Sequence, residues 1–125
     1  MVRGIGVDII EIERIQKSIE SLGEHFLQKI FTPGEIAYCT SKPTAAQHFA
    51  ARFAAKEALS KALATGWAGE FRWKDVEISN APWGAPCIEL HGSLREKLAR
   101  QSVLVSLSHS DSHVVAVVVI EDTVT

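Results

Sequence analysis

The sequence predicts an α+β fold, in which a mainly antiparallel sheet packs with one long central helix and several short helices. Three observations support this class: an alternating segment at residues 4–10, a long helical pattern at about 44–65, and two β-branched runs at 103–107 and 114–120. Strands and helices are segregated along the chain, which favours α+β over α/β. A chain of 125 residues is expected to form a single domain over residues 1–125.

The composition indicates a folded, soluble protein and argues against two kinds of partner. Apolar residues make up 46% of the chain, and 13 Lys and Arg are outnumbered by 15 Asp and Glu, so no nucleic-acid partner is expected. The longest apolar run, residues 114–120, is far shorter than the ~20 residues of a membrane span. Two isolated cysteines, Cys39 and Cys87, and an N-terminus without a signal-peptide core predict a cytoplasmic protein with reduced thiols and no membrane partner.

The first strand, residues 4–10, alternates two kinds of residue. Ile5, Val7 and Ile9 share one face, which we expect to be the buried one, and Asp8 points the other way among glycines. An acidic residue inside an apolar strand is a local conflict, and such conflicts tend to be functional. The alternative is that Asp8 serves as a cap or turn partner at the end of the strand.

Helical spacing predicts a helix from Ile12 to Leu22, stopped by Gly23, and a short helix over residues 24–31. Capping boxes then mark three further helix starts. Thr32-Pro-Gly-Glu35 opens a short helix. Thr44-Ala-Ala-Gln47 opens the longest helix, which runs to about Thr65 and stops at Gly66. Ser93-Leu-Arg-Glu96 opens a helix that runs to about Arg100.

We expect five positions on one side of the long helix to form its core stripe. Glu57 and Lys61 lie beside that stripe on an alanine-lined flank, where a bulky group can approach closely. Their simplest interpretation is an i,i+4 surface pair worth about 0.2–0.5 kcal/mol. Arg52 and Lys56 fall on the opposite flank, either as solvated charges or with Arg52 reaching a phosphate. The stripe comprises Phe49, Phe53, Ser60 and Leu63, with Leu59 at its edge, and the flank comprises Ala46, Ala50, Ala54 and Ala64.

Asp8 and Glu57 together fit a Mg²⁺ site. This ion takes one or two carboxylates and fills its other positions with water and substrate phosphate. Lys61, one helical turn from Glu57, would then place a positive charge on a phosphoryl oxygen.

The remaining segments predict strands at 73–79 and 87–90, joined by a rigid loop at 80–86, and a C-terminal hairpin. The hairpin tip, residues 106–113, carries hydroxyls and imidazoles that suit an anion. His109 and His113 are alternatively zinc ligands, but no third ligand stands at a fitting spacing. The third alternative is a simple solvated tip. No Walker loop or three-glycine dinucleotide motif is present.

Taken together, these motifs resemble the holo-acyl-carrier-protein synthases, which are 4′-phosphopantetheinyl transferases. The resemblance spans nearly the whole chain and is carried by five segments in the right order. They are residues 4–15 (GIGVDIIEIERI), 31–35 (FTPGE), 53–62 (FAAKEALSKA), the loop 80–86 and 105–109 (VSLSH).

The resemblance implies a fold like that of the 4′-phosphopantetheinyl transferases and transfer of phosphopantetheine from coenzyme A to a serine of apo acyl carrier protein. Adenosine 3′,5′-bisphosphate is released, and the carrier serves either fatty acid biosynthesis or a secondary pathway. The resemblance also implies a homotrimer with sites in clefts between subunits. The alternative is a coenzyme A or nucleotide-binding module on the same fold, without catalysis.

By the same resemblance, Asp8 and Glu57 match the metal ligands, Lys61 the lysine of the helix motif and His109 the histidine close to the coenzyme. Gly84 and Pro86 match the loop on the adenine side. The expected catalytic residues are Glu57, Lys61 and Asp8. Glu57 is favoured as the base that takes the serine proton, directly or through a metal-held water, with Asp8 as the second candidate.

Arg14 matches the first helix of the family, where the carrier protein docks, and Lys17 lies beside it. An acidic carrier calls for a basic docking helix, but this helix also carries Glu11, Glu13 and Glu20. The alternatives are a contact through fewer charges and more apolar surface, from Ile10, Ile15 or Phe26, or a less acidic partner.

Overall fold

The computed structural model describes residues 1–63 and 71–123. The described residues form two sheets and a set of mostly short helices. In chain order they are β1 (Val2–Glu11), α1 (Ile12–Leu22), α2 (Glu24–Ile30), α3 (Pro33–Thr40), α4 (Ala45–Leu63), the 3₁₀ turn η1 (Trp73–Asp75), β2 (Val76–Asn80), β3 (Pro86–Leu90), α5 (Gly92–Lys97), β4 (Gln101–His109) and β5 (His113–Asp122).

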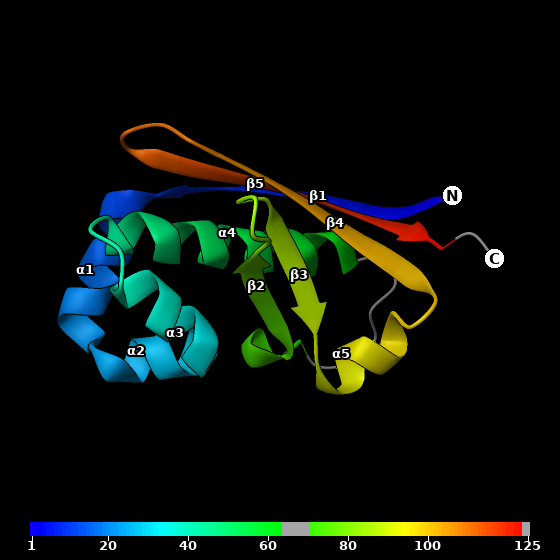
Figure 1. Cartoon of the computed structure of the whole chain (residues 1–125), viewed down its shortest axis with the longest axis horizontal. Helices are drawn as coiled ribbons and strands as arrows, with labels where there is room; N and C mark the ends of the chain where they lie inside the picture. Colours follow the sequence, from blue (N-terminus) through cyan, green and yellow to red (C-terminus); the bar gives the residue numbers. More distant parts are fainter. Residues whose placement is uncertain (64–70, 124–125) are drawn as a thin grey trace.

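The predicted fold class is confirmed. Strands β1, β5 and β4 form an antiparallel sheet in that order, and β2 and β3 form a separate two-stranded antiparallel hairpin. Helix α4 runs along the three-stranded sheet, and the short helices and the β2–β3 hairpin lie on its other side (Figure 1). The long helix therefore contacts almost every layer of the molecule and is its central element.

The buried face of β1 was predicted wrongly. Ile5, Val7 and Ile9 are 68%, 54% and 63% exposed, and the opposite face, with Asp8, lies on α4. The reason is the close approach of the strand to the helix: a Cβ on Gly6 would lie only 1.9 Å from the carbonyl oxygen of Ala58. The glycine face is therefore the inner face because it has no side chains to hold the helix away.

The burial pattern of α4 also differs from the predicted stripe. Phe49, Leu59 and Leu63 are buried as expected, but Phe53 and Ser60 are only half-buried. Arg52 and Lys56 are 3% and 0% exposed, which contradicts their interpretation as solvated charges. A single apolar stripe describes a surface helix, whereas α4 is covered on both sides by other elements.

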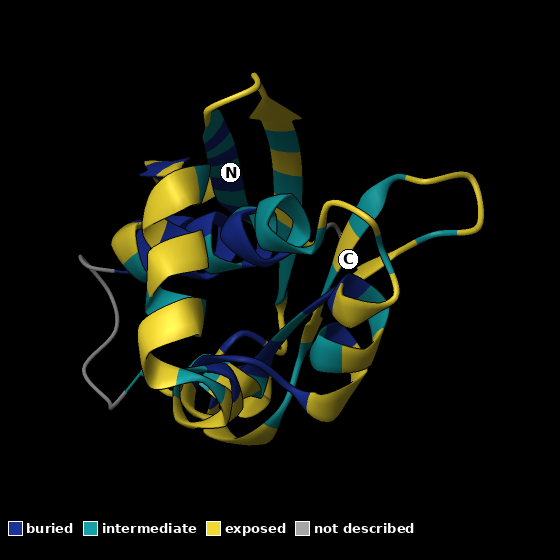
Figure 2. Cartoon of the chain, turned by 90° about the vertical axis from the view of Figure 1, so that its left-hand side faces the viewer, coloured by how far each residue is buried: buried dark blue, intermediate teal, exposed yellow. Residues whose placement is uncertain are grey.

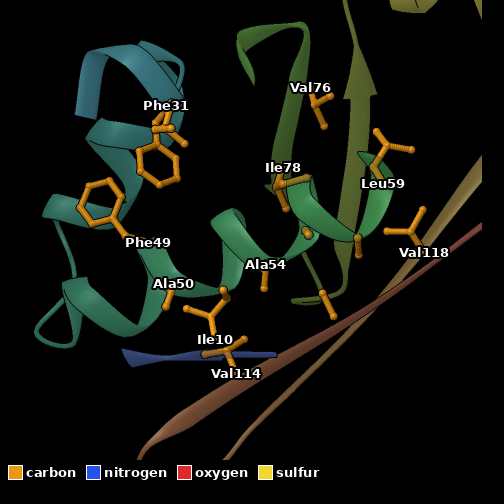
Figure 3. Packing of buried hydrophobic residues seen from close by; sticks show 14 of the residues in the cluster. Ile10, Phe31, Phe49, Ala50, Ala54, Leu59, Val76, Ile78, Val114 and Val118 are labelled. Atoms are coloured by element: carbon orange, nitrogen blue, oxygen red, sulfur yellow. The ribbon is translucent and has the colours of Figure 1, made fainter. Parts of the chain in front are cut away.

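The core forms where α4 meets the two layers beside it. Phe31 and Phe49 face each other with ring centroids 4.9 Å apart, and Ile10 and Val114 lie under Ala50 and Ala54 (Figure 3). At this end of the molecule the buried segments lie inside, and the outer faces of the helices are exposed (Figure 2). The fixed position of α4 in this core determines where its charged side chains lie.

The predicted helix ends are confirmed in part. The Thr32–Glu35 capping box is present in both directions. The box at Ser93 is not: the helix starts at Gly92 after His91, has no side-chain cap, and ends at Lys97 rather than near Arg100. Residues 73–75 form the 3₁₀ turn instead of a strand. The expected end of the long helix at Gly66 lies outside the described residues.

Two sequence-based expectations concern the solvent environment of the chain. Within residues 1–63 and 71–123, no helix is both long enough and apolar enough to cross a membrane. Cys39 and Cys87 are both free, Cys39 in the core and Cys87 at the surface. Burial raises the pKa of the Cys39 thiol to about 11, so this thiol stays protonated in the native protein at neutral pH.

Candidate functional site

Asp8 and Lys61 form the centre of the candidate site. The Nζ of Lys61 lies 3.0 Å from Oδ1 of Asp8 and donates to the carbonyl oxygen of Val7 at 3.1 Å. The Asp8 side chain is only 12% exposed, whereas that of Lys61 is 53% exposed. The ammonium group thus neutralises an inward-facing carboxylate and still offers protons to a ligand in solvent.

Glu57 lies near the same carboxylate. Burial raises the pKa of Glu57, and the negative charge of Asp8 raises it further, while the charges of Lys61 and Arg14 act in the opposite direction. The structure therefore brings the predicted residues Asp8, Glu57 and Lys61 together. Arg14 of α1 is close enough for its charge to act on the pKa of Glu57.

The donor set at this point suits a hard divalent cation. Oδ2 of Asp8 is buried and has no hydrogen-bond partner. A buried carboxylate oxygen without a partner is costly, and a second carboxylate, Glu57, adds like charge beside it. Two carboxylates with an open side are typical of Mg²⁺ sites that also use substrate phosphate. The residues present therefore fit the expected ion.

Arg52 belongs to a second group, on another side of α4. Its guanidinium donates to Oδ1 of Asn80 at 2.9 Å, and Asn80 donates through Nδ2 to the carbonyl oxygen of Gly84 at 3.0 Å. The guanidinium also lies over the ring of Tyr38, 4.4 Å from its centroid. The predicted residues Arg52 and Gly84 are thus joined through Asn80, and Pro86 begins the strand that follows the same loop.

His109 extends this group toward the start of α4. Its Nε2 lies 3.3 Å from Nε2 of Gln47. Burial lowers the pKa of neighbouring His48, and the nearby charges of Arg52, Lys42 and His109 lower it further. Four basic residues therefore gather here: Lys42, His48, Arg52 and His109.

The sequence analysis missed three members of this second group. Lys42, His48 and Tyr38 carried no motif, and they contact one another only through the fold: Lys42 Nζ lies 4.8 Å above the Tyr38 ring, and His48 packs edge-on against it. Lys42, the one basic residue on the turn of chain between α3 and α4, was the one available signal. Among the described residues, no hydrogen bond, ion pair or ring contact joins this group to Asp8, Glu57 or Lys61.

The predicted docking residues lie on a groove along α1. Leu22, which lines this groove, is 55% exposed. Lys17 is paired with Glu13 at 3.4 Å, so only part of its charge is available to a partner. Ile10 and Ile15 are buried and offer no docking surface, and Phe26 is half-buried. The lining residues are Glu11, Glu13, Arg14, Lys17, Ser18, Ser21 and Leu22.

A further cluster of possible metal ligands lies on the β2–β3 hairpin. Ligand atoms of Glu77, Glu89 and His91 lie within 4.8 Å of one another. Glu77 accepts the hydroxyl of Thr32 at 2.8 Å and lies 3.1 Å from Nε2 of His91, and these hydrogen bonds lower its pKa. The zinc alternative at His109 and His113 gains no third ligand among the described residues.

Comparisons with known proteins place the chain in one family. Residues 4–118 match the family model of the 4′-phosphopantetheinyl transferase superfamily. A holo-[acyl-carrier-protein] synthase of Koribacter versatilis is 44% identical over 125 residues, covering 98% of this chain and all of the relative.

Solved structures agree with this assignment. The holo-[acyl-carrier-protein] synthase of Neisseria meningitidis matches with a TM-score of 0.87 at 32% identity, over 98% of this chain and all of the other. The Helicobacter pylori enzyme, solved in complex with coenzyme A, matches with a TM-score of 0.82 at 38% identity, over 94% and 99% of the two chains. The chain therefore belongs to the 4′-phosphopantetheinyl transferase superfamily, and it is a transferase.

Proposed function

We propose that this protein transfers the 4′-phosphopantetheine group of coenzyme A to a serine hydroxyl of an apo acyl carrier protein, with Mg²⁺ as cofactor. The observation that carries the proposal is the buried, unpartnered Oδ2 of Asp8 beside Glu57 and Lys61. The family and the coenzyme A complex of the Helicobacter pylori relative support the same substrate.

In this reaction the serine oxygen bonds to the phosphorus that carries pantetheine. The bond from this phosphorus to the bridging oxygen breaks, and adenosine 3′,5′-bisphosphate leaves. Asp8 and Glu57 would hold Mg²⁺, and the ion would supply positive charge for the phosphoryl group that is transferred. Lys61 supplies a second positive charge from the partly exposed Nζ, which suits a reaction in which negative charge develops on phosphoryl oxygens.

Glu57 is the proposed acceptor of the serine proton. A carboxylate beside Mg²⁺ stays ionised at neutral pH, so Glu57 could accept the proton directly or through a metal-held water. Asp8 is less suited to this role because its Oδ1 is already held by Lys61.

The second group of residues suits the nucleotide end of coenzyme A. Arg52 and Lys42 provide positive charge for a phosphate, His48 and His109 lie beside them, and the Gly84 loop is joined to Arg52 through Asn80. We assign Arg52, His109, Gly84 and Pro86 to coenzyme A binding, with Lys42 and His48 as additions made from the structure.

A homotrimer with sites between subunits is part of the proposal. Glu57 follows Arg52 by five residues on α4, a rotation of about 140° at 100° per residue, so the two groups face different sides of the helix. Two copies side by side can present one group each to the same coenzyme A molecule. The exposed outer face of the sheet, with Ile5, Val7 and Ile9, offers an apolar surface for such contact.

The assembly is tested by the mass of the particle in solution. We expect the mass of three chains by light scattering after gel filtration. A charge at Val7, as in Val7→Glu, should give a folded particle of lower mass and reduced activity. A wild-type monomer that is fully active would contradict the shared site.

The reaction itself is tested by mass spectrometry of an apo carrier protein after incubation with coenzyme A, Mg²⁺ and this protein. Phosphopantetheine should appear on the carrier. Asp8→Ala and Glu57→Ala should keep the fold and lose most activity, whereas Glu96→Ala, which removes an exposed carboxylate on α5, should stay active. Binding of coenzyme A without transfer to carriers of fatty acid or secondary pathways, beside an active control enzyme, would favour the non-catalytic binding module.

A further inference from the structure

A buried ion pair under α4 takes no part in the chemistry described above. Lys56 and Glu35 have fully buried side chains, and Nζ lies 2.7 Å from Oε1. Burying two charges is costly, and hydrophobic replacements are often at least as stable. Buried pairs of this kind are best explained where they fix the register of packed elements.

The hydrogen bonds of the pair show which elements it holds. Lys56 uses all three ammonium protons, on Glu35 and on the carbonyl oxygens of Ile30 and Trp73, at 2.7, 2.9 and 3.0 Å. Glu35 also accepts the backbone N–H of Ile78 at 2.8 Å. One turn of α4 is thereby tied to the end of α2, to α3, to η1 and to β2.

Helix α4 needs such a tie because its own surface is smooth. Eight of its nineteen residues are alanines, and Ala54, Ala55 and Ala58 are completely buried. Methyl groups interdigitate less deeply than larger side chains, so they specify the rotation of a helix about its axis less strongly. A rotation of α4 would move every side chain that it presents to β1.

Lys56 and Glu57 are neighbours, about 100° apart around the helix. Because the Lys56 ammonium is held in three directions, the rotation of α4 is fixed, and with it the direction in which the Glu57 side chain leaves the helix. We propose that the Lys56–Glu35 pair positions Glu57, keeping its carboxylate turned toward Asp8 so that both can bind one divalent cation. Both members are positioning residues, and the inference rests on the proposed function for the cation.

The test compares cation affinity in a variant without the pair. Lys56→Met with Glu35→Gln removes both charges together and leaves an amide oxygen for the Ile78 N–H. Leu94→Ala is the matched control, because it opens the core at buried Leu94 of α5 without touching the pair. The probe is Mn²⁺, followed through paramagnetic broadening of the backbone amide NMR signals of Asp8 and Glu57, below the melting temperature of every variant.

In the wild type, both signals should broaden at the same Mn²⁺ concentration. The double variant should need at least about tenfold more Mn²⁺ for the same broadening, as is typical when a residue that orients a metal ligand is lost. Leu94→Ala should match the wild type in Mn²⁺ affinity despite a lower melting temperature. A purely structural pair would lower the melting temperature in the same way and leave the affinity unchanged.

Equal Mn²⁺ affinity in the wild type and the double variant would overturn the inference. A wild type without broadening at Asp8 and Glu57 would instead refute the cation site of the proposed function, and the inference with it. Should the double variant fail to fold, Glu35→Gln alone carries the test, because Lys56 then keeps both carbonyl partners. Its affinity should fall in the same direction, and an unchanged value would overturn the inference.

Discussion

Gly6 is the position where one methyl group should disturb both the fold and the site. In Gly6→Ala, the new Cβ would lie 1.9 Å from the carbonyl oxygen of Ala58 and 2.8 Å from the backbone nitrogen of Ala62. Both neighbours are helix backbone, which cannot rotate away as a side chain can. Strand β1 would have to move from α4 by about 1 Å before the shorter contact reached even 3.0 Å, a distance at which such contacts are still rare.

The consequences for the site follow from the position of Asp8, two residues further along the same face of β1. A displacement of this size would lengthen the 3.0 Å contact between Asp8 and Lys61 toward about 4 Å. It would also move the Asp8 carboxylate away from Glu57. Overpacking of a core costs about 1–3 kcal/mol and occasionally more. We expect the upper part of that range, because the obstacle is backbone.

Urea unfolding and the carrier-modification assay measure the two effects. Gly34→Ala is the control: its Cβ would lie 2.7 Å from Oε2 of Glu77, a side-chain atom that can move at the expense of its hydrogen bond from the Thr32 hydroxyl. Alanine also favours the helix in which Gly34 lies. Gly6→Ala should lose stability and most activity, whereas Gly34→Ala should lose less stability and keep its activity. Wild-type stability and activity in Gly6→Ala would refute the close packing of β1 on α4.

Three other outcomes are expected. Thr32→Ala should lower the free energy of unfolding by about 0.5–2 kcal/mol in urea titrations, because it removes the hydroxyl that caps α3 and binds Glu77; no change would mean that the box does not stabilise the helix. Lys61→Ala should lower transfer activity strongly, because Asp8 loses its ion pair with the Lys61 ammonium and the phosphate loses one contact. Circular dichroism should show unchanged secondary structure, and full activity would exclude a role for Lys61. The stability should fall as the pH rises from about 9 to about 11, because the Cys39 thiol ionises at its ordinary pKa of 9.0 only in the unfolded chain; Cys39→Ala should remove this component of the pH dependence, and an unchanged slope would contradict it.

The candidate site was more predictable from the sequence than the packing around it. Asp8, Glu57 and Lys61 were identifiable because each charge stands in an apolar or alanine-rich setting, where it is conspicuous. The Thr32 capping box is local chemistry between residues three apart, and the sequence contains all of it. By contrast, Lys42 and His48 join Arg52 only because a turn of chain brings α3 and α4 together.

The burial of Lys56 shows why the rest was not predictable. On a helical wheel a lysine is assigned to solvent, since an isolated ammonium is too costly to bury. What makes burial possible is a set of partners in three other elements, up to 26 residues away in the chain. Periodicity describes one element at a time and carries no information about such partners. The same limit explains the wrongly predicted face of β1. The close approach of α4 determines which face of the strand is buried, and the alternation of residues along the strand contains no information about that helix.

The two most recognisable segments of the sequence act as one structural unit. On β1 the inward positions are Gly4 and Gly6, and on α4 the residues opposite them are Ala58 and Ala62. These small residues allow backbone to lie on backbone, and the next inward residue of the strand is Asp8. Because the two elements are so close there, a side chain as short as aspartate contacts Lys61, and its charge raises the pKa of Glu57. Larger residues at the glycine and alanine positions would keep the same three charged groups in the sequence and separate them in space, so the small residues are as necessary to the site as the charged ones.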